Sequence, residues 1–159
     1  MTNYVYQNDL PDDLDLGPVV AIDCETMGLN PHRDRLCVVQ LSGGDGNAHL
    51  VQIAIGQTDA PNLCRLLIDP DVLKLFHFGR FDIAAMLNAF GVLTAPVYCT
   101  KIASRLIRTY TDRHGLAKLL HELLQIDRPV SISCRCARGL IWKGGPKRTS
   151  SRIHDDPFP

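Results

Sequence analysis

Residues 19–29 read VVAIDCETMGL, an apolar run that leads into two carboxylates. The apolar residues predict a buried β-strand, in which successive side chains alternate between the two faces of the sheet. Asp23 and Glu25 lie two positions apart, so their carboxylates point to the same side. Two like charges side by side are unfavourable unless a positive charge lies between them, and Mg²⁺ and Mn²⁺ prefer carboxylate oxygens. The stretch therefore predicts a divalent-cation site at the end of a strand.

The composition is that of a single globular domain. The chain has 159 residues, of which 45% are apolar and 21% are charged. This is enough for one hydrophobic core and too little for two ordinary domains. The apolar stretches are shorter than a membrane span, and the first ten residues do not resemble a signal peptide. We therefore expect a cytoplasmic protein without membrane contact, and the sequence leaves its oligomeric state open.

The charge is divided unevenly along the chain. Residues 128–159 contain five arginines and two lysines against two aspartates, a net charge of +5, and residues 1–127 carry the balancing −5. The basic segment is rich in Arg, Ser, Gly and Pro and has no helical or strand periodicity. These features predict a domain over residues 1–127 and an irregular basic tail over 128–159. Cys134 and Cys136 lack the second ligand pair that a zinc site needs, which favours ordinary cysteines there.

The hydrophobic pattern before the tail predicts a mixed sheet. After a connector at Asn8–Asp15, the expected strands are the run from Val19, then Leu36–Leu41, His49–Ile53, Lys74–Phe78 and Val97–Cys99. The expected helices are Ala60–Leu67, Arg80–Phe90, Lys101–Arg108 and Gly115–Leu124. The first three strands form a meander, and the order β-β-β-α-β-α-β-α-α predicts an α/β fold with five strands flanked by helices.

A second informative segment begins where the fourth expected strand ends. His77 and Phe78 close the strand, Gly79 makes the turn, and Asp82 falls in the first turn of the next helix. An aspartate there can simply favour the helix N-terminus, by at most about 1 kcal/mol. However, open α/β sheets place their active sites where strands end and helices begin. Asp82 could therefore approach Asp23 and Glu25 from a neighbouring strand.

Both segments resemble motifs of the DEDD 3′–5′ exonucleases, and the ribonuclease D-like branch is the most similar. Ile22–Thr26 with Gly28 and Leu29 looks like the first motif, and His77–Asp82 looks like the second. Arg108–Leu116 is similar to that group's entry into the helix after the second motif. The resemblance covers about residues 8–127. It implies a ribonuclease H-like fold that is incomplete at its C-terminus.

The resemblance also implies an activity, namely two-metal hydrolysis of phosphodiester bonds from the 3′ end of RNA. Asp23 would bridge two Mg²⁺ or Mn²⁺ ions, Glu25 would hold the ion that activates water, and Asp82 would steady the second ion. The residues expected to bind the terminal nucleotide are Thr26, Met27, Gly28, Leu29, His77, Arg80 and Phe81. Leu29 would provide an apolar surface beneath the base. For Arg80 there are two equal alternatives, namely a phosphate contact and a solvated position at the start of a helix.

The third motif of the family is not found. It requires an aspartate that follows a tyrosine by four residues or a histidine by five. No tyrosine here has such an aspartate, and only His77 satisfies the histidine spacing, with Asp82 of the second motif. Asp155 and Asp156 lack a helical context and a Tyr or His at either spacing. Since the resemblance stops where the basic tail starts, we also consider that a shifted reading frame encodes the tail from about Arg128.

Three functions remain open at the level of sequence. The first is a 3′–5′ exoribonuclease that acts on RNA 3′ ends, with single-stranded DNA as a further substrate class. The second is a truncated, catalytically impaired relative that only binds metal and nucleic acid, because the fourth carboxylate is missing. The third is a nucleic-acid-binding module that uses the basic tail, whose aromatic residues are only Trp142 and Phe158.

Overall fold

The computed structural model describes residues 2–30 and 32–126. The predicted tail over residues 128–159 lies outside them, together with Cys134, Cys136 and the proposed shift of reading frame. Within the described ranges, no helix combines the length and the apolar character that crossing a membrane requires.

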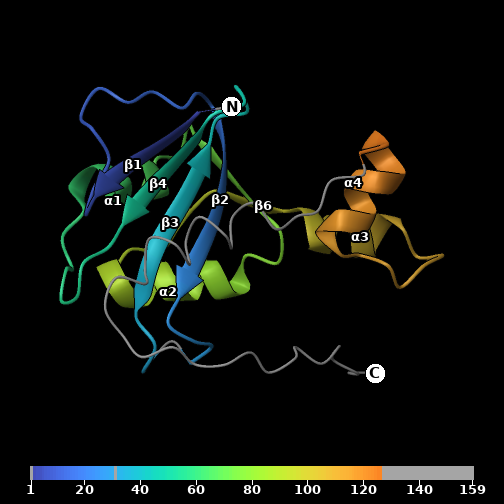
Figure 1. The fold of residues 1–159 in the computed structure, drawn as a ribbon. Coiled ribbons are helices and arrows are strands. Elements are labelled where there is room, and N and C mark those ends of the chain that lie inside the picture. Colours follow the sequence, from blue (N-terminus) through green and yellow to red (C-terminus); the bar gives the residue numbers. More distant parts are fainter. Residues whose placement is uncertain (1, 31, 127–159) are drawn as a thin grey trace, which may run out of the picture.

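A mixed sheet of six strands in the order β1-β4-β3-β2-β5-β6 forms the centre of the molecule (Figure 1). The antiparallel meander of β2, β3 and β4 is confirmed. β5 runs parallel to β2, β6 runs parallel to β5, and β1 runs parallel to β4. The strands are β1 (Asn3–Gln7), β2 (Val19–Thr26), β3 (Leu36–Ser42), β4 (Ala48–Gln52), β5 (Leu73–Phe76) and β6 (Val97–Cys99).

The predicted count of five strands was wrong, because β1 was missed. This strand lies at the edge of the sheet, paired with β4 from Asn3 to Gln7, and only Tyr6 is partly buried. An exposed edge strand has no alternation of buried apolar and exposed polar residues, so its sequence gives little signal. β5 also ends earlier than predicted, at Phe76. Phe78 has a φ of +68°, a left-handed conformation that does not continue a strand.

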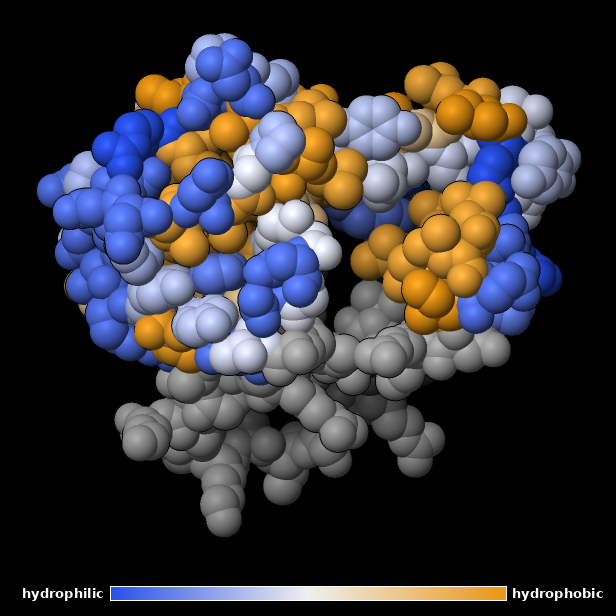
Figure 2. All heavy atoms as spheres, turned by 90° about the horizontal axis from the view of Figure 1, so that it is seen from above, coloured by the Kyte–Doolittle hydropathy of each residue, from blue (hydrophilic) through white to orange (hydrophobic). Residues whose placement is uncertain are grey.

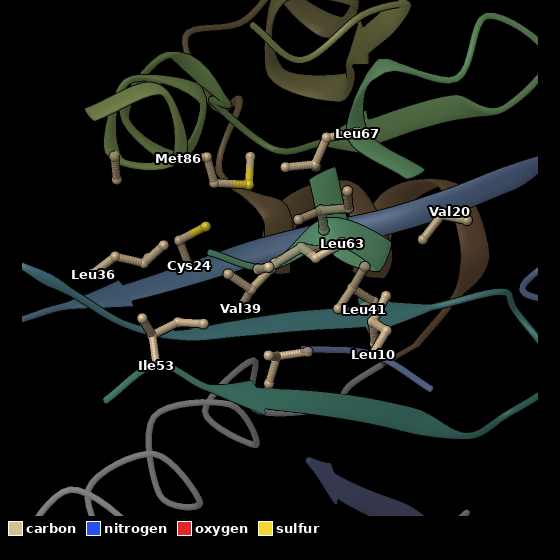
Figure 3. Close-up of a cluster of buried hydrophobic side chains, with 14 of the residues drawn as sticks. Leu10, Val20, Cys24, Leu36, Val39, Leu41, Ile53, Leu63, Leu67 and Met86 are labelled. Atoms are coloured by element: carbon tan, nitrogen blue, oxygen red, sulfur yellow. The ribbon is translucent and has the colours of Figure 1, made fainter. Parts of the chain in front are cut away.

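Two helices cover one face of the sheet and form the core with it. They are α1 (Pro61–Ile68) and α2 (Arg80–Phe90), and Gly91 ends α2 with a φ of +72°. Figure 3 shows Leu63 and Leu67 of α1 and Met86 of α2 beside the side chains of the sheet. The sheet contributes alternate residues of β2, together with residues of β3: Val20, Ile22, Cys24, Leu36, Val39 and Leu41. The core therefore lies on the face of β2 that Cys24 shares.

Two further helices, α3 (Thr100–Ile107) and α4 (Leu116–Leu124), stand away from the sheet beyond β6 (Figure 1). The buried guanidinium of Arg108 joins them, because it donates to the Ser104 hydroxyl at 3.2 Å and to the Arg113 carbonyl at 3.1 Å. The same guanidinium pairs with the carboxylate of Glu122 on α4. All four predicted helices are therefore present, and the segment from Arg108 to Leu116 forms the polar joint between the last two.

The α3–α4 hairpin exposes a large apolar surface (Figure 2). The two helices border a groove of about 510 Å³, in which most of the lining side chains are apolar. The most exposed apolar side chains on these helices are Ile102, Leu106, Ile107, Leu123 and Leu124. α1 and α2, in contrast, direct most of their large apolar side chains into the core, and among those side chains only Ile68 and Leu87 are exposed.

The difference between the two kinds of helix can be measured. Leu63→Ala removes a side chain that is 0% exposed, so we expect a loss of about 2–5 kcal/mol in the free energy of unfolding. Leu106→Ala is the matched control, because Leu106 is 74% exposed, and its effect is expected to stay within about 0.5 kcal/mol. Urea denaturation followed by circular dichroism measures both. Equal losses in the two variants would contradict this assignment of the core.

Candidate active site

The alternation of β2 places the two carboxylates of the first motif on the face opposite the core. Cys24 is buried in the core, whereas Asp23 on one side of it is exposed and Glu25 on the other is partly buried. The apolar side chains of β2 thus determine the face to which Asp23 and Glu25 point. Burial of Val20, Ile22 and Cys24 leaves Asp23 and Glu25 only the other face.

The place of Asp82 follows from the short pairing between β2 and β5. β5 pairs only with Val19–Ala21, so the second half of β2 has no ladder partner on that side. Asp82 lies in the first turn of α2, is 7% exposed, and accepts a hydrogen bond from the Cys24 N–H at 2.9 Å. The carboxylate supplies the acceptor that a longer β5 would otherwise provide, so the buried Cys24 N–H has a hydrogen-bond partner. The structure therefore brings Asp82 to the residue that separates Asp23 from Glu25.

The three carboxylates influence one another electrostatically. Burial is the main cause that raises the pKa of Asp82 to about 6, and the negative charges of Asp23 and Glu25 add to it. The hydrogen bond from the Cys24 N–H opposes this shift. The protein around the Asp23 carboxylate removes part of its solvent and so raises its pKa as well, although the residue as a whole remains exposed. The pKa of the Cys24 thiol is raised well above its ordinary value by burial and by the charges of all three carboxylates. Such a cluster is relieved by a cation or by protons.

A divalent cation suits the donors that are present. Within residues 2–30 and 32–126, no three side chains of the types His, Cys, Asp and Glu form a ready-made cage for a metal ion. Mg²⁺ does not need such a cage, since it usually binds one or two carboxylates and completes its shell with water and substrate phosphate. The candidate donors are all carboxylate oxygens, which Mg²⁺ and Mn²⁺ prefer. The joint ligand set predicted from the sequence stays a prediction.

The loop after β2 presents the residues predicted to meet the terminal nucleotide. The Thr26 hydroxyl donates to the Gly28 carbonyl at 2.6 Å. A Cβ atom on Gly28 would lie 2.3 Å from the Asp34 carboxylate, so a side chain there would require Asp34 to move. Met27 and Leu29 are exposed, Leu29 to 85%. An apolar side chain this exposed on a fixed loop is available to contact a base.

The turn from β5 into α2 is held by the junction between β6 and α3. The Thr100 hydroxyl donates to the Phe76 carbonyl at 3.1 Å and lies 2.9 Å from Nδ1 of His77. The Phe78 N–H donates to Sγ of Cys99 at 3.2 Å. Burial and the positive charge of Lys101 lower the pKa of His77. His77 therefore has a fixed position, and so does the start of the helix that carries Asp82.

The contacts of Cys99 and Thr100 with the turn before α2 were not predicted from the sequence, and neither was a contact near them. The ammonium group of Lys101 lies 4.3 Å from the centre of the Phe78 ring, which is about half exposed. This junction follows from the parallel register of β5 and β6, which pairs Phe76 with Cys99. The remaining predicted residues lie at the start of α2, where Arg80 is exposed and Phe81 is partly buried. Arg80 is thus accessible to a phosphate.

The candidate site thus combines two acidic side chains at the end of a central strand with a third from the first turn of the neighbouring helix. A sequence model described as "3'-5' exonuclease" matches residues 4–151 of this chain. The chain belongs to this family, the DEDD 3′–5′ exonucleases. The match continues past the predicted domain boundary at residue 127.

Similar proteins agree with this family. The chain is 35% identical to a protein named ribonuclease D from Acidiphilium cryptum over 133 residues, which are 82% of this chain and 33% of that protein. The chain thus spans only about a third of the length of this curated relative.

Solved structures agree on the fold as well. The structure of Brucella melitensis NrnC bound to pGG is 57% identical, covers 81% of this chain and 64% of that chain, and superposes with a TM-score of 0.78. Escherichia coli ribonuclease D, titled an exoribonuclease involved in structured RNA processing, is 28% identical with a TM-score of 0.60 and covers 74% of this chain and 30% of that chain. The predicted ribonuclease H-like α/β fold is therefore confirmed.

The raised pKa of Asp82 predicts a pH dependence of stability in the absence of metal. The folded carboxyl keeps its proton up to about pH 6, whereas the unfolded chain releases it near pH 4. Its contribution to stability is therefore present at low pH and is lost as the pH rises through about 6. Asp82→Asn keeps an acceptor for the Cys24 N–H and cannot ionise. We expect it to be more stable than the wild type at pH 7.5 in EDTA, by up to about 3 kcal/mol.

Urea denaturation at pH 4.5 and at pH 7.5 measures this effect. Asp34→Asn is a control of opposite sign, because the ion pair with Arg33 lowers the pKa of Asp34 to about 2. Its removal should bring no gain in stability at pH 7.5. If Asp82→Asn gives no greater advantage at pH 7.5 than at pH 4.5, the electrostatic coupling of the three carboxylates is refuted.

Proposed function

We propose that this chain is a metal-dependent 3′–5′ exonuclease that hydrolyses phosphodiester bonds at the 3′ end of RNA. The observation that carries the proposal is the hydrogen bond from the Cys24 N–H to Asp82, which places this carboxylate at the residue between Asp23 and Glu25. Membership of the exonuclease family supports the reaction class, and the relatives named ribonuclease D support RNA as the substrate. A structure of NrnC with bound Mg²⁺, 57% identical to this chain, supports a divalent cation.

The three carboxylates would hold two divalent cations, Mg²⁺ or Mn²⁺. When bound, such ions lower the pKa of water and stabilise the charge that develops on the leaving oxygen. Asp23 is central to the set, since it lies on the same face as Glu25 and is coupled to Asp82. Asp82 keeps its orientation through the Cys24 N–H, and this bond does not depend on a ligand.

The neighbouring residues would position the 3′-terminal nucleotide. Leu29 offers an exposed apolar surface to its base, and Thr26 and Gly28 fix the loop that carries Leu29. His77 is held by Thr100 on the other side of the turn. Arg80 is exposed at the start of α2 and would contact a phosphate. Stacking against a base is tolerant of sequence, so cleavage should not depend strongly on base identity.

Short RNA is the substrate class we favour. The chain is 57% identical to NrnC, whose structure contains pGG. The identity to Escherichia coli ribonuclease D is lower, at 28%. pGG is therefore the first substrate to test, beside single-stranded RNA and single-stranded DNA of the same sequence.

A second candidate is an impaired relative that binds metal and nucleic acid without efficient hydrolysis. Two observations favour it. The third motif is missing from the sequence, and no group of three metal-binding side chains is preassembled in the described part of the chain. In that case the cation would bind more weakly, and no tyrosine or histidine would orient the water.

Hydrolysis of end-labelled substrates tests both candidates. RNA labelled at its 5′ end should show a ladder that shortens stepwise from the 3′ end in Mg²⁺ or Mn²⁺ and should be unchanged in EDTA. Asp23→Asn should lower the rate about a thousandfold or more, because a cation contributes several kcal/mol of transition-state stabilisation. Lys118→Gln on α4 is the control and should leave the rate unchanged.

The outcomes separate the candidates. Stepwise shortening that Asp23→Asn abolishes supports the exonuclease. A thermal shift with Mg²⁺ in the wild type, without any shortening of RNA or pGG, supports the impaired relative. A rate that is equal in the wild type and in Asp23→Asn would show that the hydrolysis does not come from this site.

A further inference from the structure

We propose that Gln40 is a positioning residue for Asp23, and that its side-chain amide donates a hydrogen bond to the Asp23 carboxylate when this carboxylate binds a cation. The inference rests on the proposed function, in which Asp23 is a metal ligand. It assigns a role to a polar side chain in the middle of β3, whose other residues are almost all apolar.

The register of the sheet places the two side chains side by side. Gln40 lies directly opposite Asp23 in the antiparallel ladder of β2 and β3. Residues opposite each other in such a ladder point to the same face, with Cβ atoms about 4.5–5.5 Å apart. This distance is within the reach of a glutamine amide and an aspartate carboxylate. Gln40 therefore lies beside the candidate metal site, on the face away from the core.

The amide nitrogen of Gln40 has no hydrogen-bond partner among the described residues. Its Nε2 atom is buried and donates no hydrogen bond, and it is one of only two buried side-chain polar atoms without a partner in the described ranges. A buried donor without an acceptor is costly, and native proteins contain few of them. Such a group therefore points to a partner that forms when the site is occupied.

The neighbours of Gln40 leave Asp23 as its acceptor. On the β4 side, Gln40 is paired with Leu50, which is apolar and buried. Along β3, the residues on the same face are Val38 and Ser42. The Ser42 hydroxyl already donates to the Asn47 carbonyl and accepts from the Gly44 N–H. Among these direct neighbours, only Asp23 has free acceptor capacity of the right kind.

The chemistry of a carboxylate ligand explains the value of this bond. A carboxylate that binds a metal ion is commonly held by a hydrogen bond to its other lone pairs, and loss of this partner weakens metal affinity or activity tenfold to a hundredfold. An amide N–H suits this role because it is neutral and does not compete with the cation for charge. Gln40 would keep Asp23 oriented while Asp82 is kept oriented by the Cys24 N–H.

Gln40→Met tests the inference, because methionine keeps the length of the side chain and removes the amide. Replacing an unsatisfied buried amide by an apolar group should leave the melting temperature in EDTA unchanged or raise it. The same variant should weaken Mg²⁺ binding about tenfold to a hundredfold, as measured by Mg²⁺ titration of the melting temperature. A residue that served the fold alone would not separate the two readouts in this way.

Two controls make the result interpretable. Gln52→Met changes the same residue type on the same face of the sheet, where Gln52 is bonded to Gln7 at the β1–β4 edge, and it should leave Mg²⁺ binding unchanged. Asp23→Asn should abolish the Mg²⁺ shift. Unaltered Mg²⁺ affinity in Gln40→Met overturns the inference alone. A wild type without any Mg²⁺-dependent shift refutes the proposed metal site, and the role of Gln40 with it.

Discussion

The hydrogen bond between the Cys24 N–H and the Asp82 carboxylate joins the two halves of the candidate site. It exists because β5 pairs with only the first part of β2, which leaves backbone donors of β2 without a ladder partner on that side. A buried N–H needs an acceptor, and a carboxylate in the first turn of α2 supplies one. The same contact fixes the start of α2 against β2, so that the geometry of the acidic cluster and the packing of the helix depend on one another.

The arrangement carries an electrostatic cost as long as no cation is bound. Asp82 is buried beside two other carboxylates. The backbone hydrogen bonds to its carboxylate do not offset the loss of solvent, because its pKa remains raised to about 6. The surrounding structure nevertheless prevents the cluster from spreading apart. Gly28 packs against Asp34 on one side, and Thr100 and Cys99 hold the turn that leads to Asp82 on the other. Rigid support of this kind keeps charged groups close together for a ligand.

Much of this site could be predicted from sequence, because its strongest signals are local. The spacing of Asp23 and Glu25 on an apolar strand sets their common direction, and the glycine-bounded segment from Arg80 to Phe90 forms the predicted helix. The junction of Cys99 and Thr100 could not be predicted in this way. Its hydrogen bonds join residues that are 21 to 24 positions apart. A local hydrophobic pattern does not indicate contacts over such a distance in the sequence. β1 was also not predicted. Its residues are mostly exposed, and it pairs only with β4 among the described strands.

Two unusual features of the chain lie close together in the sequence. The third motif of the family is absent from the segment after residue 127, where the composition becomes basic, although the family match continues to residue 151. The exposed apolar side chains of the described part include those of α3 and α4, the last two helices before this position. Apolar surface of this extent is typical of a face that another element covers. The shift of reading frame considered from about Arg128 stays a hypothesis, and it would account in one step for the missing carboxylate and for an apolar face on α3 and α4.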